Sequence, residues 1–324
     1  MFKTLLSAAA VLAGVKAADG PGLAIITSQE GLTDTTHILV PYIFGFLHDL
    51  HLPDVSTSGL SLKNITVTLP VPDAEAVNIT NVPASNSVKL DAARIHMKMH
   101  AAFEFKYLFL DVKGGMEVDF INDGVGVHIP LALGTQPGTH GTDLAPKVTT
   151  TGLKIDLNPD NVNITLTGDL VAKIAGILIP LIKNTILPEV IKQVETQATE
   201  LINTTLDEDL AKYGTQITIP FLGGVTLDFA QLAGSPKITD DASAMLALNG
   251  TFFDINHPTA SPYHPSAFDP TDRQGHMLQA YFTDYVLNTM FAAGFSTGNT
   301  VDLSKILALL NVTITTGELG LVIP

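Results

Sequence analysis

Two pairs of histidines are the side chains in this chain whose spacing could serve metal chemistry. His48 and His51 lie three residues apart, and His96 and His100 lie four residues apart. A zinc site needs at least three protein ligands, and no third ligand is apparent beside either pair. The second pair also falls on sequence that reads as a strand. We therefore predict surface or half-buried histidines and no metal site.

Two short glycine motifs have the letters of catalytic or phosphate-binding sequences. Gly294–Gly298 reads G-x-S-x-G, the pattern of a nucleophile elbow, in which the serine follows a strand and opens a helix. Here the motif follows a predicted helix and the glycine that ends it. Gly124–Gly126 lacks the third glycine and the helix of a phosphate loop, and we interpret it as a bend in a strand. We expect no catalytic residue, no cofactor and no enzymatic activity.

Six asparagines stand in N-x-S/T sequons, the acceptor sequence for N-linked glycans in secreted proteins. Chance supplies several such triplets in a chain rich in Asn and Thr, so their number only supports secretion. We predict glycosylation at Asn64, Asn78, Asn163, Asn203, Asn249 and Asn311.

The first residues have the three parts of a secretory signal peptide. Lys3 is followed by the apolar run Leu5–Val15 and then by small residues, and cleavage is expected after Ala17. This run is too short to span a bilayer, and so is the later run Ile174–Ile182, which two lysines bracket. We expect a secreted, extracellular protein.

Acidic residues outnumber basic residues about two to one. The 324 residues contain 32 Asp and Glu against 17 Lys and Arg, a formal net charge of −15 at pH 7. Nucleic acid and anionic lipids repel such a surface. The bases of the strand region are spread out rather than clustered, at Lys63, Lys89, Arg94, Lys98, Lys106 and Lys113. Cysteine is absent, so the fold has no disulfide and depends on burial.

Between residues 59 and 169 apolar and polar residues alternate with the period of two that a half-buried strand requires. Such runs include Leu60–Leu69, Met116–Phe120 and Leu153–Leu157, and Gly, Pro, Asn and Asp turns separate them. This pattern predicts an antiparallel meander with one apolar face. A second strand region is predicted over 217–253.

The longest helical pattern runs from Gly168 to Leu206, and the rest of the chain is organised around it. Its apolar face begins with Val171, Ile174, Leu178 and Ile182 and continues with Val190, Val194, Ala198 and Leu201. Pro180 and Pro188 interrupt it, so we expect one long element with bends.

Two shorter helices are expected on either side of these elements. The first covers Thr33–Leu50 and has one apolar face formed by Leu32, Leu39, Ile43, Phe46 and Leu50. The second covers Met277–Gly294, where the glycine acts as a stop, and follows the proline-rich linker Asn256–Thr271.

Several short motifs occur in a defined order along the chain. ITSQEGL (Ile26–Leu32) is similar to I-[ST]-x-x-G-L, and LPD (Leu52–Asp54) is similar to [IL]-P-D at the end of a first helix. Further on, LALNGTFFD (Leu246–Asp254) is similar to x-G-x-F and is followed by the linker. After the linker, YFTDYVLNT (Tyr281–Thr289) is similar to [IL]-S-[DE]-Y-x-x-N-[ST], and AAG is similar to A-G. The ordered set resembles the family of bactericidal/permeability-increasing protein, lipopolysaccharide-binding protein and the cholesteryl ester and phospholipid transfer proteins of plasma.

This resemblance implies an α+β fold of the tubular lipid-binding type, in which a highly twisted antiparallel β-barrel wraps around a long bent helix. The divisions that it implies are a signal peptide over 1–17, an N-terminal barrel over 18–229, shared strands and linker over 230–272, and an incomplete second barrel over 273–324. The family's first barrel carries a disulfide between strands and long helix, whereas Thr149–Thr151 and Ile191 offer no cysteine here. We expect 273–324 to lack partner surface within this chain, and so to be mobile or docked on another.

The resemblance also implies an apolar tunnel for acyl chains between the helices and the concave side of the sheet, with headgroups at its mouth. Burial of one CH₂ is worth about 0.8 kcal/mol, so roughly sixteen carbons supply ~13 kcal/mol gross. The alternative is that the same side chains pack against one another without a tunnel. The lining residues that we expect are Leu39, Ile43, Phe46, Val171, Ile174, Leu178 and Ile182.

We therefore predict a secreted protein that binds a phospholipid or a similar acyl lipid, with transient membrane contact and with transfer between membranes as an extension of that role. Nucleic acid is not an expected partner. The alternative is a non-enzymatic recognition or innate-defence glycoprotein that binds bacterial lipopolysaccharide or a protein partner. The acidic charge disfavours lipopolysaccharide, because the family members that bind it carry basic clusters.

Overall fold

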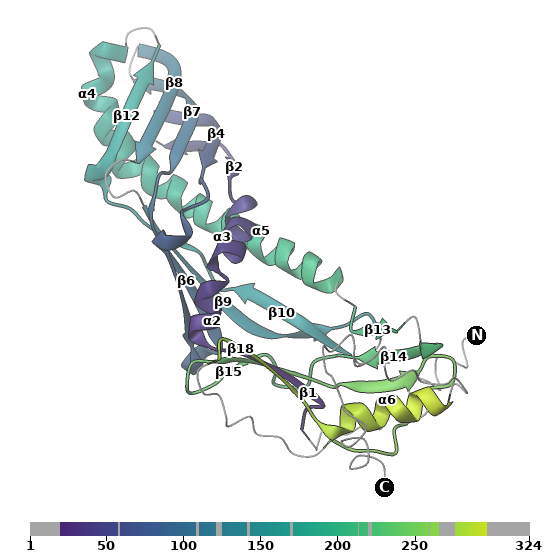
Figure 1. Ribbon diagram of the computed structural model, residues 1–324. Coiled ribbons are helices and arrows are strands. Elements are labelled where there is room, and N and C mark those ends of the chain that lie inside the picture. Colours follow the sequence, from purple (N-terminus) through teal and green to yellow (C-terminus); the bar gives the residue numbers. More distant parts are fainter. Residues whose placement is uncertain are drawn as a thin grey trace.

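The computed structural model describes residues 20–296, apart from 58, 108–109, 121–124, 141–142, 169–170, 213, 220–221, 259 and 266–275. The molecule is elongated (Figure 1). One sheet lies at its upper end, two lie at its lower end, and a long helix runs diagonally between them.

A six-stranded antiparallel sheet forms the upper end. Its strands lie in the order β12 (Val162–Thr167), β8 (Leu110–Phe120), β7 (Lys98–Tyr107), β4 (Leu60–Thr68) and β2 (Asp49–Leu52), and β3 (Val55–Thr57) also pairs with β4. The alternation predicted from the sequence is confirmed on β4, where Leu60, Leu62 and Val67 are buried and Lys63 is exposed. One face of this sheet is therefore apolar and the other polar.

A five-stranded sheet, named the middle sheet below, lies between the upper sheet and the lower end of the molecule. Its order is β10 (Leu144–Thr150), β9 (Val125–Pro137), β6 (Ser87–Ile95) and β5 (Val77–Val82), and β11 (Lys154–Asp156) also pairs with β9. Short 3₁₀ turns connect the strands at η1 (Ala74–Ala76), η2 (Pro83–Ser85) and η3 (Pro159–Asn161).

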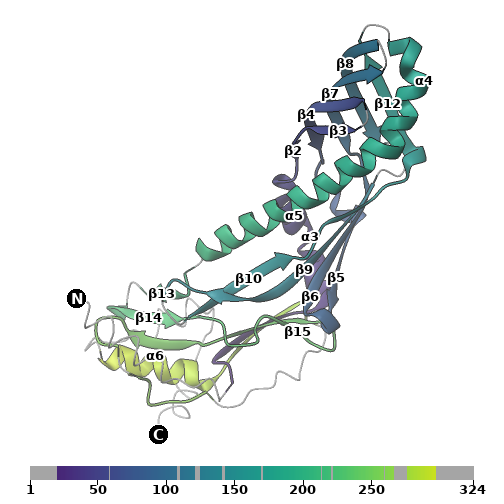
Figure 2. The ribbon, with the colours of Figure 1, turned by 180° about the vertical axis from the view of Figure 1, so that it is seen from behind.

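The predicted long helix consists of α4 (Val171–Leu181), the π-helical turn η4 (Ile182–Ile186) and α5 (Leu187–Lys212), and it bends between α4 and α5 (Figure 2). Pro188 has no N–H and its ring crowds the carbonyl of Asn184, so the wider π turn relieves a contact that a regular α-helix would make there. By length and composition, Ile174–Lys212 would pass as a membrane span. Its buried stripe faces the protein core, which is typical of a core helix.

Two small sheets form the lower end. One has the order β15 (Lys237–Ile238), β16 (Ala244–Leu248), β1 (Leu23–Thr27) and β18 (Leu278–Phe282), and the other has β13 (Gln216–Thr218), β14 (Val225–Asp228) and β17 (Thr251–Asp254). Helix α6 (Asp284–Ser296) packs on β17 and β14, whereas α2 (Gln29–Asp34) and α3 (Thr36–Gly45) lead from β1 back toward the upper sheet.

The predicted α+β class is confirmed, with two differences in detail. The strands of the described residues form open sheets rather than a closed barrel. The first predicted helix is two short ones, opened by Ser28, whose Oγ accepts from the N–H of Gly31, and Leu50 lies in strand β2 instead. Pro41 is tolerated inside α3.

The second predicted helix begins later than expected, at Asp284. Leu278–Phe282 of the predicted helix instead form β18, which pairs antiparallel with β1 and places Leu23 opposite Phe282 and Thr27 opposite Leu278. Pairing with a strand from the start of the chain is a tertiary effect that local apolar spacing does not contain. The prediction of a helix over 277–282 is therefore wrong.

Residues 278–296 have partners within this chain, contrary to our expectation for this region. The N–H of Thr283 donates to the carbonyl of Gly22, and the Oγ1 of Thr289 accepts from the N–H of Phe252. The hydroxyls of Tyr285 and Thr251 lie 2.6 Å apart. A Cβ at Gly31 would collide with the carbonyl of Met277, which explains why the early ITSQEGL motif needs a glycine there.

Because of these contacts, cutting the linker should not release the C-terminal piece. We expect that cleavage at a protease site inserted between Phe268 and Asp269 gives two fragments that elute together in native gel filtration. The same fragments should separate in denaturant. Separate elution of the C-terminal fragment in native buffer would contradict the pairing of β18 with β1.

Candidate lipid-binding site

The inner faces of the upper and middle sheets and the long helix share one continuous apolar cluster. The upper sheet contributes alternate residues such as Leu62, Met99 and Val118, all fully buried. The long helix contributes its buried stripe, which runs through Ile174, Leu178, Ile182, Ile186, Val190, Val194, Ala198 and Ile202. The strand period of two and the helical period near 3.6 therefore deliver side chains to the same interior.

Six of the seven predicted lining residues belong to this cluster. Ile43 of α3, Ile174 and Leu178 of α4, and Ile182 of η4 are at most 4% exposed. Leu39 and Phe46 are partly buried and pack against the same cluster. Val171 is the first residue of α4, and its side chain lies outside the described part of the structure.

The chemistry of this interior is dispersion and hydrophobic contact alone. Every residue from Ile174 to Leu181 is apolar or glycine. The cluster itself is built from Leu, Ile, Val, Met, Phe and Ala. Such a surface can hold hydrocarbon, but it offers no nucleophile, acid or base.

A shallow hollow among the described residues lies elsewhere. It has a volume of about 320 Å³ and lies on the outer face of the upper sheet, where Asn64, His100, Glu117 and Thr165 border it. None of the six predicted lining residues whose side chains are described borders this hollow. Instead, the described members of that set pack against neighbouring side chains in the cluster.

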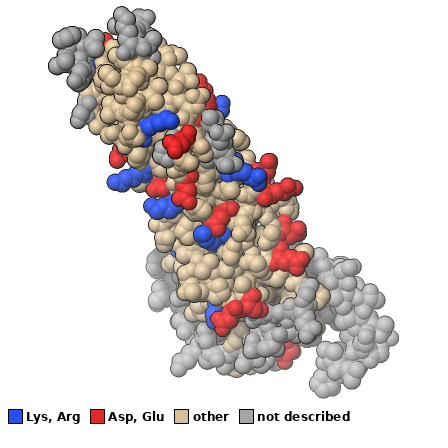
Figure 3. Space-filling view, turned by 90° about the vertical axis from the view of Figure 1, so that its left-hand side faces the viewer, with Lys and Arg blue, Asp and Glu red and all other residues tan. Residues whose placement is uncertain are grey.

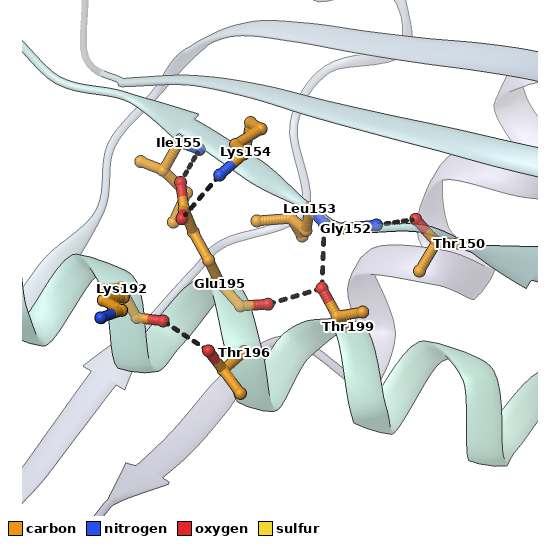
Figure 4. Close-up of polar contacts among 9 residues, drawn as sticks. All are labelled: Thr150, Gly152, Leu153, Lys154, Ile155, Lys192, Glu195, Thr196 and Thr199. Atoms are coloured by element: carbon orange, nitrogen blue, oxygen red, sulfur yellow. Dashed lines mark hydrogen bonds and ion pairs between the residues drawn. The ribbon is translucent and has the colours of Figure 1, made fainter.

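A series of polar side chains on α5 holds this helix against the segment from the end of β10 to β11 (Figure 4). The carboxylate of Glu195 accepts from the N–H of Ile155 at 2.9 Å, and Thr199 Oγ1 accepts from the N–H of Leu153 at 2.9 Å. One turn further along, Asn203 both accepts from the N–H and donates to the carbonyl of Thr150, at 2.7 and 3.1 Å.

These three side chains recur every four residues, so they lie on one stripe of α5. They bind main-chain groups of Thr150, Leu153 and Ile155. Hydrogen bonds therefore join the strands and the long helix in the region where Thr149–Thr151 and Ile191 offer no cysteine. The sequence analysis missed this contact, although the E-x-x-x-T-x-x-x-N spacing was a readable signal of a polar stripe.

His128 of β9 lies between two carboxylates on neighbouring strands. Its Nδ1 is 2.5 Å from an oxygen of Asp91 on β6, and its Nε2 is 3.0 Å from an oxygen of Asp156 on β11. The hydrogen bond that His128 donates to Asp91 raises the pKa of His128, burial opposes this rise, and the contact with Asp156 adds to it. Lys89 also reaches Asp91, at 3.0 Å.

We expect this bridge to make stability depend on pH. Since the folded-state pKa of His128 lies above its unfolded value of about 6.5, its stabilisation is complete below that value and is lost as pH rises through the folded pKa. His128→Gln should therefore lower the urea midpoint clearly near pH 5 and only slightly near pH 9. An equal loss at both pH values would show that the charge on His128 is irrelevant.

Each lysine of the scattered set has a carboxylate nearby. Lys63, Lys106 and Lys113 all lie within 3.6 Å of Glu104. Hydrogen bonds from Lys106 and Lys113 lower the pKa of Glu104 to about 2. Lys98 pairs with Asp119 at 3.3 Å. The upper sheet therefore carries mixed charge on its outer face rather than a basic patch.

The histidine pairs and the serine motif fall at separate surface positions. His48 pairs with its neighbour Asp49, whereas His51 contacts Thr66. Within the described residues no cluster of three or more His, Asp or Glu could hold a metal ion. Ser296 lies in the last turn of α6, where its hydroxyl donates to the carbonyl of Ala293, and the rest of that motif lies outside the described residues.

The six sequons differ in their surroundings. Asn64, Asn78 and Asn163 are exposed on strands. The amide nitrogen of Asn203 donates to Thr150, and that of Asn249 donates to Asp228, whose own pKa burial raises. Asn311 lies outside the described residues. Glycosylation remains a prediction at all six.

Comparison with known proteins places the fold but not the family. No family model matches the chain, and no curated protein matches it. The crystal structure of lipopolysaccharide binding protein is similar, with a TM-score of 0.59 and 18% identity, over 83% of this chain and 58% of that chain. Takeout 1 from Epiphyas postvittana is similar at a TM-score of 0.38 and 15% identity, over 57% of this chain and 91% of that chain. The first likeness supports the common fold, and the second is too low to carry an argument.

Proposed function

We propose that this protein is a secreted, non-enzymatic lipid-binding protein that holds an acyl chain between its helices and the inner faces of its sheets. The observation that carries this proposal is the continuous apolar cluster shared by α3, α4, η4 and both sheets, in which the described lining candidates meet. Hydrocarbon is the ligand chemistry that such an interior suits.

Binding requires space that the packed interior must provide by moving. The two halves of the long helix differ in how they are held. Glu195, Thr199 and Asn203 fix α5 through hydrogen bonds. In α4, the residues from Ile174 to Leu181 have apolar side chains or none. Because the apolar segment Ile174–Leu181 has no side-chain hydrogen bonds to break, we place the opening motion in α4, with the π turn η4 as the hinge.

The outer side of α4 suits contact with a lipid surface. Ile177 is 57% exposed, and Gly176 and Pro180 are exposed on the same helix. In Figure 3 the described charges gather over the middle of the molecule, and few lie at the upper end. The exposed apolar side chain of Ile177, on a face with few described charges, favours transient contact with a neutral bilayer, from which an acyl chain would enter beneath α4.

Anionic lipopolysaccharide is a weaker candidate as ligand. Its phosphates would require free basic side chains, whereas Lys63, Lys98 and Lys106 each lie beside a carboxylate. The net charge of −15 adds long-range repulsion. We therefore take a phospholipid or another acyl lipid with little net charge as the ligand class.

Extraction of the purified secreted protein tests this proposal. We expect organic extraction and mass spectrometry to recover acyl lipid in a fixed molar ratio to protein, above the amount recovered from a secreted control protein of the same host. Delipidated protein should bind a fluorescent fatty acyl probe with saturation at a similar ratio. Absence of both would favour a recognition protein with a filled core.

A further inference from the structure

Asn64 occupies a backbone position that turns its side chain away from the regular strand. It lies in β4 where the register with β7 shifts between Lys63 and Thr66, the mark of a β-bulge. Its φ is 52°, in the left-handed region that asparagine tolerates better than most residues. The bulge presents the amide of Asn64 on the exposed face of the sheet.

The amide of Asn64 is itself part of the wall of the 320 Å³ hollow described above. At about 30 Å³ per water, this volume holds roughly ten waters, enough for a sugar ring. Gly115, which has no side chain, forms part of the lining and helps to leave the space open. Any group attached to the amide nitrogen of Asn64 therefore begins at the edge of the hollow.

The protein uses only part of the polar lining of the hollow: the Oγ1 of Thr167 donates to the carbonyl of Gly115 at 3.3 Å. The register places His100 of β7 opposite Glu117 of β8, and Glu117 opposite Thr165 of β12. Neither His100 nor Glu117 makes a side-chain hydrogen bond or ion pair with any described residue. An imidazole, a carboxylate and a hydroxyl in one row are the groups that bind sugar hydroxyls and an acetamido group.

We propose that the hollow holds the first N-acetylhexosamine of an N-linked glycan on Asn64. The carboxylate of Glu117 accepts from sugar hydroxyls, and His100 and Thr165 bind the remaining polar groups. This makes Asn64 an ordered glycan site, unlike Asn78, whose glycan would project from the middle sheet. The inference needs the chain to enter the secretory pathway, but it does not need lipid binding, so either can fail alone.

The sequence supplies matched internal controls. Asn64, Asn78 and Asn163 all stand in the same tripeptide, N-I-T, and all three are exposed on strands. The full chain, secreted from a eukaryotic host, is treated with peptide N-glycosidase in native buffer, and release at each site is followed by peptide mass spectrometry. We expect release at Asn64 to be at least tenfold slower than at Asn78, and equal after denaturation.

Two variants test whether Glu117 causes the slow release at Asn64. Glu117→Ala should raise the native release rate at Asn64 to that at Asn78. Asp119→Ala, two residues along the same strand and facing the same side, should leave it slow. An unmodified Asn64 in the secreted protein overturns the proposal. So does native release as fast as at Asn78, or a slow rate that Glu117→Ala leaves unchanged.

Discussion

Phe46→Asp should lower the affinity for a fluorescent fatty acyl probe by at least tenfold, while Ile38→Asp leaves it unchanged. Phe46 follows α3 and is only partly buried where it packs against the apolar cluster, so the variant can fold with its carboxylate at the surface of the interior. An acyl chain there would lie beside a charge, which costs more than the ~1.4 kcal/mol of a tenfold change. Fluorescence titration of delipidated protein measures the effect.

Ile38 is a matched control because it lies on α3, the helix that Phe46 follows, and is 61% exposed. Both variants gain one negative charge, so general repulsion of an anionic probe affects them equally. Circular dichroism confirms that each is folded. Equal weakening by the two variants would place the probe on the surface rather than in the interior.

The fold class could be read from the sequence because two periods are distinct in it. The alternation along β4 places Leu60, Leu62 and Val67 inside, as predicted. The stripe from Ile174 to Ile182 lies on the buried side of the long helix, also as predicted. These features follow from local geometry, since a strand must bury alternate residues and a helix must bury one stripe.

The features that the sequence did not show depend on contacts between distant segments. Strand β18 exists because it pairs with β1, about 250 residues earlier in the chain. The π turn accommodates Pro188 by a backbone rearrangement rather than by a simple kink. The contacts of Glu195, Thr199 and Asn203 likewise depend on the main chain of 150–155, which lies about 45 residues earlier in the sequence.

The candidate site could be predicted in part from the sequence. Periodicity located its residues correctly in the interior, because burial is what periodicity reports. Whether that interior opens for a ligand depends on how cheaply α4 separates from the sheets. That free energy difference between two packings is a property of the whole cluster, and no spacing in the sequence encodes it.

Leu178→Ala should distinguish an interior that accepts lipid from one that is only a core. Leu178 is fully buried, so its truncation leaves a cavity and should lower the free energy of unfolding by about 2–5 kcal/mol without lipid. A saturating acyl ligand at about 100 times its Kd should return about 2.7 kcal/mol to the wild-type protein. In the variant the ligand also fills the cavity, so we expect a larger gain and a tighter Kd.

Leu153→Ala is the matched control, since Leu153 is 1% exposed in the same cluster but lies beside α5, where Thr199 binds its N–H. It should lose a similar amount of stability without lipid and gain only the wild-type increment with lipid. Urea unfolding of the wild type and the two variants, each with and without ligand, gives the six free energies of unfolding. If the ligand stabilises Leu178→Ala and Leu153→Ala equally, the acyl chain does not lie beside α4. If it stabilises neither variant nor the wild type, the apolar cluster is a filled core and the protein acts through its surface.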